Sequence, residues 1–339
     1  MNTPLSSSFF KRGTDFLGCD VPFLCGGMTW VSDPKLVAAV CNAGGFAALA
    51  CGNAPVDIIE KQINDTRALT QKPFAVNLIT LSPLFKEQLA TVCRLKVSHV
   101  VLAGGLPRPD AIATAKAAGC KVMCFAAAES IAKMMIKNGA DALIIEGMES
   151  GGHIGVVTTT ILIQEILFQH GEHLPIFVTG GIATGKLCAH LFMMGAAGVQ
   201  FGTIFAMSAE SIAHPALKKA YAEAASRDAV ATPILDNRFV VPSVRALKNK
   251  GLEEFTRLQL DLIPKLDNGA ITKVEAAHQL ENFWMGALRR AVIDGDIDHG
   301  SLMAGQSVGL IPASLPCADI LSRLASDTEA EFVRIKSLL

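Results

Sequence analysis

Eight short apolar segments alternate with helix-like segments along the first two thirds of this 339-residue chain. They are rich in Val, Ile, Leu, Phe and Ala, which is typical of strands that are buried on both faces. We therefore predict strands over residues 21–25, 45–50, 74–79, 99–103, 121–126, 142–146, 175–179 and 198–201.

The intervening segments have the signals of helices. Asp33 and Pro34 supply a cap and a first-turn residue for one of them. Glycine marks the end of four of them, at residues 44, 119, 139 and 195. We predict helices over residues 33–42, 56–69, 83–95, 108–118, 130–138, 160–170 and 184–194.

Strands that alternate with helices form a parallel sheet, and eight such units predict closure of the sheet into a barrel. The expected fold class is therefore α/β, a (β/α)₈ TIM barrel. The alternative is an open, doubly wound parallel sheet.

The alternation ends after Glu210. We expect a barrel made of residues 1–214 and 291–339, with a small helical lid or insert subdomain over residues 215–290. The segment 228–250 contains Pro233 and Pro242, and we expect it to be irregular. Apolar residues of the insert have two interpretations, a homodimer contact or a local core, and we favour the core; they are Phe283, Trp284 and Leu288.

Bulk composition narrows the function. Half of the residues are hydrophobic, 18% are charged and the net charge is −1, so the chain lacks the basic character of nucleic-acid-binding proteins. We see no signal peptide and no apolar run of transmembrane length, and we expect a cytoplasmic protein without a membrane partner. Nine dispersed cysteines without a CxxC pair are typical of reduced, buried thiols, and no metal site is predicted.

Active sites of TIM barrels lie at the carboxyl ends of the strands. The loops expected there are rich in glycine and polar residues, at positions 26–30, 77, 104–107, 146–155, 180–185 and 200–203. Loops after the seventh and eighth strands commonly bind phosphate through backbone N–H groups, and Gly180-Gly181 and Gly202-Thr203 fit that role.

The sixth of these strands is followed by the sequence from Glu146 to Gly155, which holds one histidine among glycines. An imidazole in such a loop exchanges protons near neutral pH, so His153 is the predicted catalytic residue. Glu149 has two interpretations, a general base or a group that fixes its own loop. Cys25 could be a nucleophile, but we favour a buried thiol because no base is visible beside it.

These motifs together resemble a family of flavin-dependent barrels that contains the nitronate monooxygenases (2-nitropropane dioxygenases) and the FMN-dependent enoyl-acyl-carrier-protein reductases (enoyl reductase II). The matching segments are 26–31, 73–77, 146–155, 180–182 and 200–203. Segments 244–249 and 286–306 are more similar to the reductase branch. Cys25 departs from the pattern of the whole family. Ile204 and Pro242-Ser243 depart from that of the reductase branch, whose cation site is not assigned to this chain.

The resemblance implies an FMN-dependent oxidoreductase with His153 facing the substrate. It implies cofactor contacts at Gly26, Met28, Thr29, Asn77, Glu146, Gly151, Gly180, Gly181, Gln200, Phe201, Gly202, Thr203 and Gln306.

The expected reaction is NAD(P)H-dependent reduction of trans-2-enoyl-acyl-carrier-protein in fatty-acid synthesis, with NADH or NADPH as the electron donor and the acyl carrier protein as a partner. The alternative is a nitronate monooxygenase that oxidises alkyl nitronates with O₂. Functions of a different class also stay open: a sugar-phosphate isomerase, an aldolase-like enzyme or a flavin-free binding module. An aldolase would require a strand-end lysine, which the predicted strands do not offer.

Overall fold

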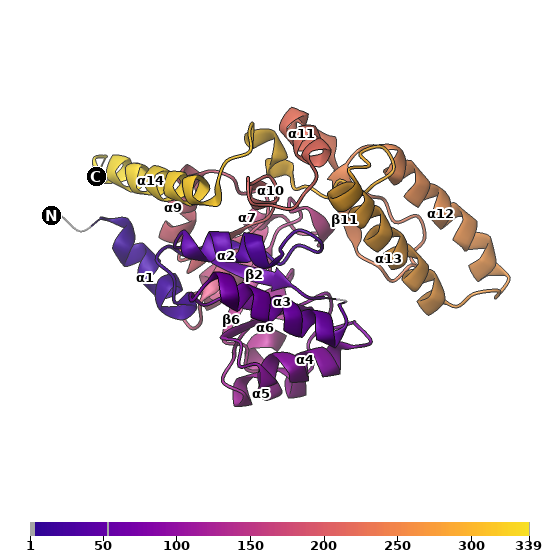
Figure 1. Ribbon diagram of the computed structural model, residues 1–339, viewed down its shortest axis with the longest axis horizontal. Coiled ribbons are helices and arrows are strands. Elements are labelled where there is room, and N and C mark those ends of the chain that lie inside the picture. Colours follow the sequence, from indigo (N-terminus) through magenta and orange to yellow (C-terminus); the bar gives the residue numbers. More distant parts are fainter. Residues whose placement is uncertain (1–3, 53, 339) are drawn as a thin grey trace.

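The computed structural model describes residues 4–52 and 54–338, and eight parallel strands form a closed barrel (Figure 1). The predicted TIM barrel is therefore confirmed, and the open doubly wound sheet is excluded. The barrel strands are β1 (Phe23–Cys25), β2 (Phe46–Ala50), β3 (Ala75–Ile79), β4 (His99–Ala103), β5 (Lys121–Ala126), β6 (Ala142–Glu146), β8 (Ile176–Thr179) and β9 (Gly198–Phe201).

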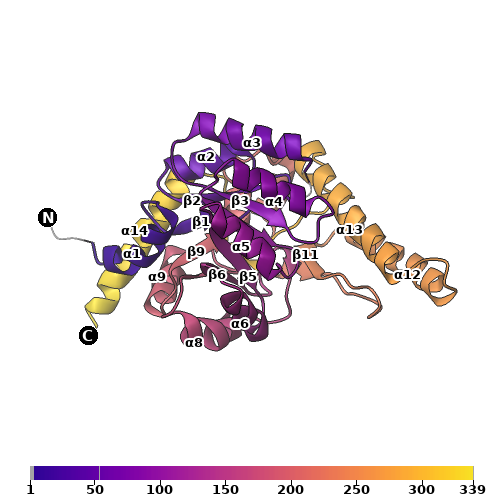
Figure 2. The same ribbon diagram turned by 90° about the horizontal axis from the view of Figure 1, so that it is seen from below.

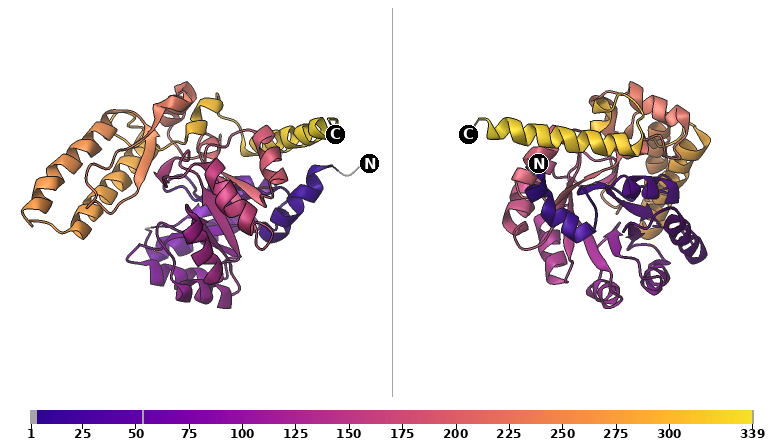
Figure 3. Two further views of the ribbon diagram at one scale, coloured as in Figure 1. Left: turned by 180° about the vertical axis from the view of Figure 1, so that it is seen from behind. Right: turned by 60° about the vertical axis from the view of Figure 1, so that its left-hand side comes forward.

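Helices surround the strands, as the right-hand view of Figure 3 shows. Asp33 caps α2 by accepting a hydrogen bond from the Leu36 amide at 2.9 Å, as its position before Pro34 predicts. The surrounding helices are α2 (Pro34–Asn42), α3 (Val56–Leu69), α4 (Phe85–Arg94), α5 (Pro109–Ala117), α6 (Glu129–Lys137), α7 (Thr159–Leu162) with a π-helical continuation over Ile163–Leu167 and α8 (Phe168–His170), α9 (Gly185–Met193), α10 (Thr203–Ala206) and α14 (Cys317–Lys336).

Alternating strand residues build two separate cores, because successive side chains of a strand point to opposite faces. One core fills the barrel interior and includes Phe46, Met123 and Phe177. The other lies between the barrel and its helices and includes Phe23 and Phe201. Burial on both faces explains why the strands are continuous apolar runs.

The amino-terminal helix α1 (Ser6–Leu17) was not predicted. It lies against one end of the barrel, and Leu17 is fully buried in the interior core. The His99 imidazole lies 3.0 Å from the carbonyl oxygen of Phe16, and burial lowers the pKa of His99 to about 4. A neutral ring nitrogen therefore joins α1 to β4.

The expectation that residues 228–250 are irregular is wrong. This segment contains β10 (Ala229–Ala231) and β11 (Ser243–Leu247), which pair with β7 (Gly152–Ile154) in an antiparallel sheet, in the order β10-β11-β7. His153 consequently lies in a short strand, not in the fully irregular loop expected for residues 147–155. The pairing joins segments that are far apart in the sequence, so no local pattern reveals it.

Residues 215–290 also contain α11 (Pro215–Glu223), α12 (Lys250–Asp267) and α13 (Lys273–Arg289), and α13 continues as a π-helical turn over Arg290–Asp294. Helices α12 and α13 project from the barrel on the side away from both termini (Figures 1 and 2). They share a small core with β11, which confirms the core interpretation of Trp284. Short 3₁₀ helices cover Ser226–Asp228 and Gln306–Leu310.

Within the described part of the chain, every helix is too short or too polar to cross a lipid bilayer.

We predict that Leu17→Ala destabilises the protein by about 2–5 kcal/mol, because it leaves a cavity at the closed end of the barrel interior. Urea unfolding of the purified protein measures the change. Ser7→Ala is the matched control on the same helix, since Ser7 is exposed. A loss below about 1 kcal/mol for Leu17→Ala would show that α1 does not seal this core.

Candidate active site

The loop after β1 lies against the amide side chains of two barrel strands. A Cβ atom at Gly26 would lie 3.2 Å from Nε2 of Gln200, and one at Gly27 would lie 2.5 Å from Cβ of Asn77. Both amide residues are buried. The fold therefore brings the loop after β1 against Asn77, in the middle of β3, and Gln200, near the end of β9.

The same loop also contacts the residues that follow β9. A Cβ atom at Gly202 would lie 3.7 Å from the sulfur of Met28. The Thr203 hydroxyl accepts a hydrogen bond of 3.0 Å from the amide of Gly305, which belongs to the carboxyl-terminal segment. Thr29 lies in the turn that the Met28 carbonyl closes by accepting from the Val31 and Ser32 amides, and its role stays a prediction.

The segment Glu146–Gly155 contacts the same carboxyl-terminal residues. A Cβ atom at Gly151 would lie 2.5 Å from the backbone of Ala304 and Gly305, so only glycine allows this approach. The Gln306 amide donates to the carbonyl oxygen of Glu149 at 2.9 Å. The structure thus places Gly151 and Gln306 side by side, although they are far apart in the sequence.

Glu149 fixes its own loop. Its carboxylate accepts hydrogen bonds from the Thr159 amide at 3.0 Å and from the Thr159 hydroxyl at 2.9 Å. Because these bonds occupy the carboxylate at the start of α7, the structure favours the loop-fixing role over that of a general base.

The His153 side chain is paired with a carboxylate that we did not predict. Its Nε2 lies 3.1 Å from Oε2 of Glu281 on α13, and the imidazole is 46% exposed. Burial opposes the charged form, but the hydrogen bond and charge of Glu281 and the charge of Glu146 outweigh it and raise the pKa of His153. The pair favours an imidazolium over a neutral base. No motif around Glu281 distinguishes it from the other charged residues of an amphipathic helix.

Glu146 ends β6 beside this histidine. Burial raises the pKa of Glu146 to about 7, although the Ser150 hydroxyl and the charge of His153 favour its ionised form. Near neutral pH the carboxyl group can therefore donate or accept a hydrogen bond, as a ligand with a polar edge requires.

Arg245 of β11 is a second unpredicted residue at the site. Its buried guanidinium donates to the carbonyl oxygen of Met148 at 3.0 and 3.1 Å and to that of Ala229 at 2.6 Å. These bonds attach the loop that precedes His153 to the sheet of the insert.

The predicted phosphate site lies in the loops after β8 and β9. Gly180 and Gly181 have φ values of 112° and 71°, which only glycine adopts readily. Among the described residues, no backbone carbonyl accepts a hydrogen bond from the amide of Gly181, Ile182, Thr203 or Ile204. Two glycine turns with available N–H groups fit an anion, and together with the buried Asn77 and Gln200 amides they fit FMN.

Phe201 contributes differently from the other predicted contacts. Its side chain packs edge-on against Phe23 and Phe205 in the outer core, and its carbonyl oxygen accepts from the Gly26 amide at 3.0 Å. The Phe201 side chain therefore points away from the proposed cofactor site, and only its backbone is placed to contact a cofactor.

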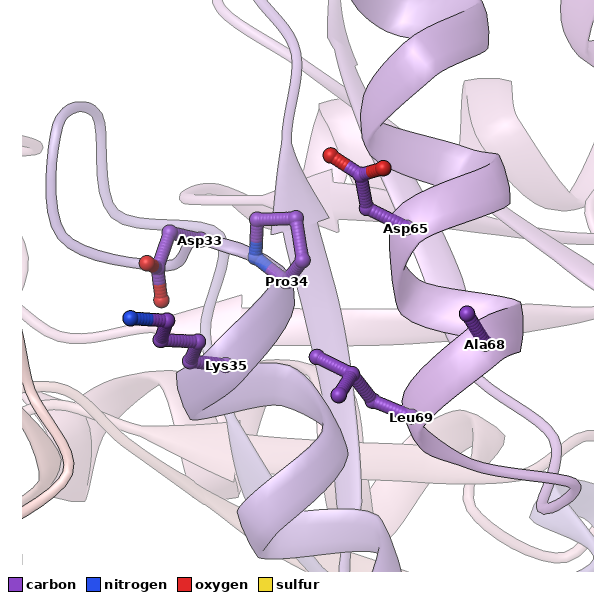
Figure 4. Close-up of a pocket in the computed structure, with 6 residues that line it drawn as sticks. All are labelled: Asp33, Pro34, Lys35, Asp65, Ala68 and Leu69. Carbon is purple, nitrogen blue, oxygen red and sulfur yellow. The ribbon is translucent and has the colours of Figure 1, made fainter.

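Other candidate features lie apart from this constellation. Cys25 is buried, and burial raises its pKa well above the ordinary value, which favours the interpretation as a buried thiol. In the described residues we find no cluster of three side chains suited to a metal ion. A groove of about 380 Å³ between α2 and α3 contains none of the predicted site residues; it is lined by Asp33, Pro34, Lys35, Asp65, Ala68 and Leu69 (Figure 4).

Comparison with known proteins shows which family and which folds this chain is similar to. The family model described as nitronate monooxygenase matches residues 11–94 and 79–327. The structure of FabK from Thermotoga maritima is 35% identical, with a TM-score of 0.85, over 97% of this chain and 99% of that chain.

Two curated relatives are similar over almost their whole lengths. The (3aS,4S,5R,7aS)-5-hydroxy-7a-methyl-1-oxo-octahydro-1H-indene-4-carboxyl-CoA dehydrogenase of Rhodococcus jostii is 30% identical over 93% of this chain and 94% of its own. The nitronate monooxygenase of Paraburkholderia phytofirmans is 28% identical over 94% of this chain and 95% of its own.

We predict that Gly151→Ala weakens FMN binding at least about tenfold, because the added methyl group displaces the Ala304–Gly305 backbone from the site. Titration of apoprotein with FMN measures the affinity. Gly286→Ala is the control, since its Cβ atom would lie 3.8 Å from its nearest neighbour. Equal affinities for the two variants would contradict the assignment of Gly151 to the cofactor site.

Proposed function

Because the chain belongs to the nitronate monooxygenase family and is an oxidoreductase, we propose that it is an FMN-dependent reductase of 2-enoyl thioesters. The electron donor is NADH or NADPH, and the acyl group is carried by the acyl carrier protein. The family supports FMN, whereas the donor, the carrier and the acyl chain are parts of the proposal.

One observation carries this choice. The two segments that resemble the reductase branch both contact the histidine-bearing loop. Arg245 of the first binds the carbonyl oxygen of Met148. From the second, Gly305 lies against Gly151, and Glu281, just before its start, pairs with His153. The segments that favour the reductase branch therefore lie next to the loop that carries the predicted catalytic residue.

The proposed cofactor residues have distinct tasks. The glycine turns at 180–181 and 202–203 hold the phosphate, and Asn77, Glu146 and Gln200 supply polar contacts to the rest of the FMN. Gly26, Met28, Thr29, Gly151 and Gln306 approach the flavin closely. Bound FMN supplies hydride chemistry, taking a hydride from the nicotinamide and giving one to the β-carbon of the substrate.

In the proposed reaction His153 gives the proton that the α-carbon requires. The hydride adds at the β-carbon, the electron pair of the carbon–carbon double bond forms the new bond at the α-carbon, and the imidazole regains a proton from solvent. General acid catalysis of this kind contributes about 10²–10⁴-fold to a rate.

Two features of the relatives define the alternatives. The family model and the Paraburkholderia relative bear the name nitronate monooxygenase, which makes nitronate oxidation the second candidate. The Rhodococcus relative is named for a CoA thioester, so coenzyme A is the alternative acyl carrier.

We further propose the predicted division of the chain, a barrel of residues 1–214 and 291–339 and a lid of residues 215–290. A lid whose helix supplies the partner of His153 would cover the substrate side of the flavin. An enzyme that acts on acyl-carrier-protein thioesters would be located in the cytoplasm, and we propose that location for this protein.

We expect NADH or NADPH to bleach the flavin under anaerobic conditions and crotonyl-acyl-carrier-protein to restore its colour. Stopped-flow absorbance measures both half-reactions, and crotonyl-CoA is the matched enoyl substrate on the other carrier. Resistance to both nicotinamides, with oxygen uptake on an alkyl nitronate, would overturn the proposal in favour of the second candidate.

We expect His153→Ala to retain FMN but to lower kcat for the enoyl thioester about 10²-fold, because it removes the proton donor. Absorbance of the purified variant reports the flavin and steady-state kinetics report turnover. Loss of the flavin from this variant would instead assign His153 a structural role.

A further inference from the structure

We propose that Glu281 is a positioning residue, which orients the His153 imidazolium for proton transfer to the substrate. The inference rests on the proposed function, because it concerns the same histidine. Its basis is the contact of 3.1 Å between Nε2 of His153 and Oε2 of Glu281, which joins β7 to α13.

Both partners of this pair are held by their backbones. His153 is in register with Val244 of β11. Glu281 lies on α13 between Leu280 and Trp284, which are buried in the core of the insert. An exposed ion pair usually gains little because two long side chains must be ordered. Here the packing of both elements has already restricted the two ends.

A second contact fixes the same helix over the barrel mouth. The guanidinium of Arg289 lies 6.0 Å from the ring centre of Trp30, in the loop after β1. Trp30 has a φ of 66°, which is uncommon for a bulky residue. Helix α13 therefore contacts the loops after β1 and β6, and this restricts where Glu281 can place the imidazole.

The charged groups around His153 favour its cationic form. Glu281 faces it from α13 and Glu146 from β6. Glu149, on the same loop, is bonded to Thr159. Arg245 on β11 directs its guanidinium to the carbonyl oxygens of Met148 and Ala229. The Glu281 carboxylate therefore acts on the ring, Glu146 adds to its effect when ionised, and the nearby cation is engaged elsewhere.

The geometry assigns different tasks to the two ring nitrogens. Because Nε2 lies 3.1 Å from Glu281, the proposal assigns Nδ1 to the substrate. Nδ1–H gives its proton to the α-carbon, Glu281 stays ionised, and the neutral ring regains a proton from water. A base for nitronate chemistry would need a neutral ring from the start, which Glu281 opposes.

The test compares Glu281→Gln with Glu254→Gln in the FMN-loaded protein. Glu254 and His299 form a similar pair of 2.6 Å, with side chains 36% and 48% exposed, against 36% and 46% for Glu281 and His153. NMR titration of the imidazole C–H signals, assigned with His153→Ala, gives the midpoint of His153 independently of activity. Circular dichroism and thermal unfolding confirm that both variants fold.

We expect Glu281→Gln to lower the titration midpoint of His153 and to move the alkaline decline of kcat for the enoyl thioester to lower pH. Glu254→Gln should change neither. An unmoved midpoint, or a moved midpoint with an unchanged pH–rate profile, would overturn the role of Glu281 while leaving enoyl reduction intact. If the wild type reduces no enoyl thioester, the proposed function fails, and the acid role falls with it.

Discussion

The pairing of β1 with β9 is the contact on which the site depends, because it converts eight parallel strands into a closed ring. In this pair Leu24 is in register with Gln200, and Cys25 with Phe201. Closure therefore places Gly26 beside the Gln200 amide, although 174 residues separate them (200 − 26). An open sheet would leave the first and last loops at opposite edges, and the two could not share a ligand.

The barrel alone does not fix His153; a second, smaller sheet does. Pairing of β7 with β11 holds the histidine backbone, and the buried Arg245 joins the preceding loop to the same strands. Glu149 attaches this loop to α7 on the other side. The proposed proton donor thus lies between the barrel and the insert, so its geometry depends on both.

Local pattern was sufficient for the barrel because each strand is buried on both faces and ends in a turn with its own residues. All eight predicted barrel strands agree with the structure to within two residues, the largest difference being the start of β1 at Phe23. Glycine at the strand ends also indicated which loops would meet. The sheet around His153 was not predictable in this way, because β7 and β10 are three residues long and pair across distant segments. Glu281 was missed because its significance comes only from what the fold places opposite it.

A barrel with one imidazole over a flavin can support opposite proton transfers, and the surroundings of the ring decide between them. A neutral ring accepts a proton, whereas a carboxylate beside the ring stabilises the imidazolium and makes it a donor. In this chain the carboxylate of Glu281 comes from the insert and not from the barrel. Glu281 lies outside the barrel strands and their loops, so on the proposed mechanism a change at this position alters the protonation of His153 and leaves the proposed cofactor residues unchanged. On this mechanism the residue opposite His153 decides the direction of proton transfer, whereas the proposed cofactor contacts of the glycine motifs serve either reaction.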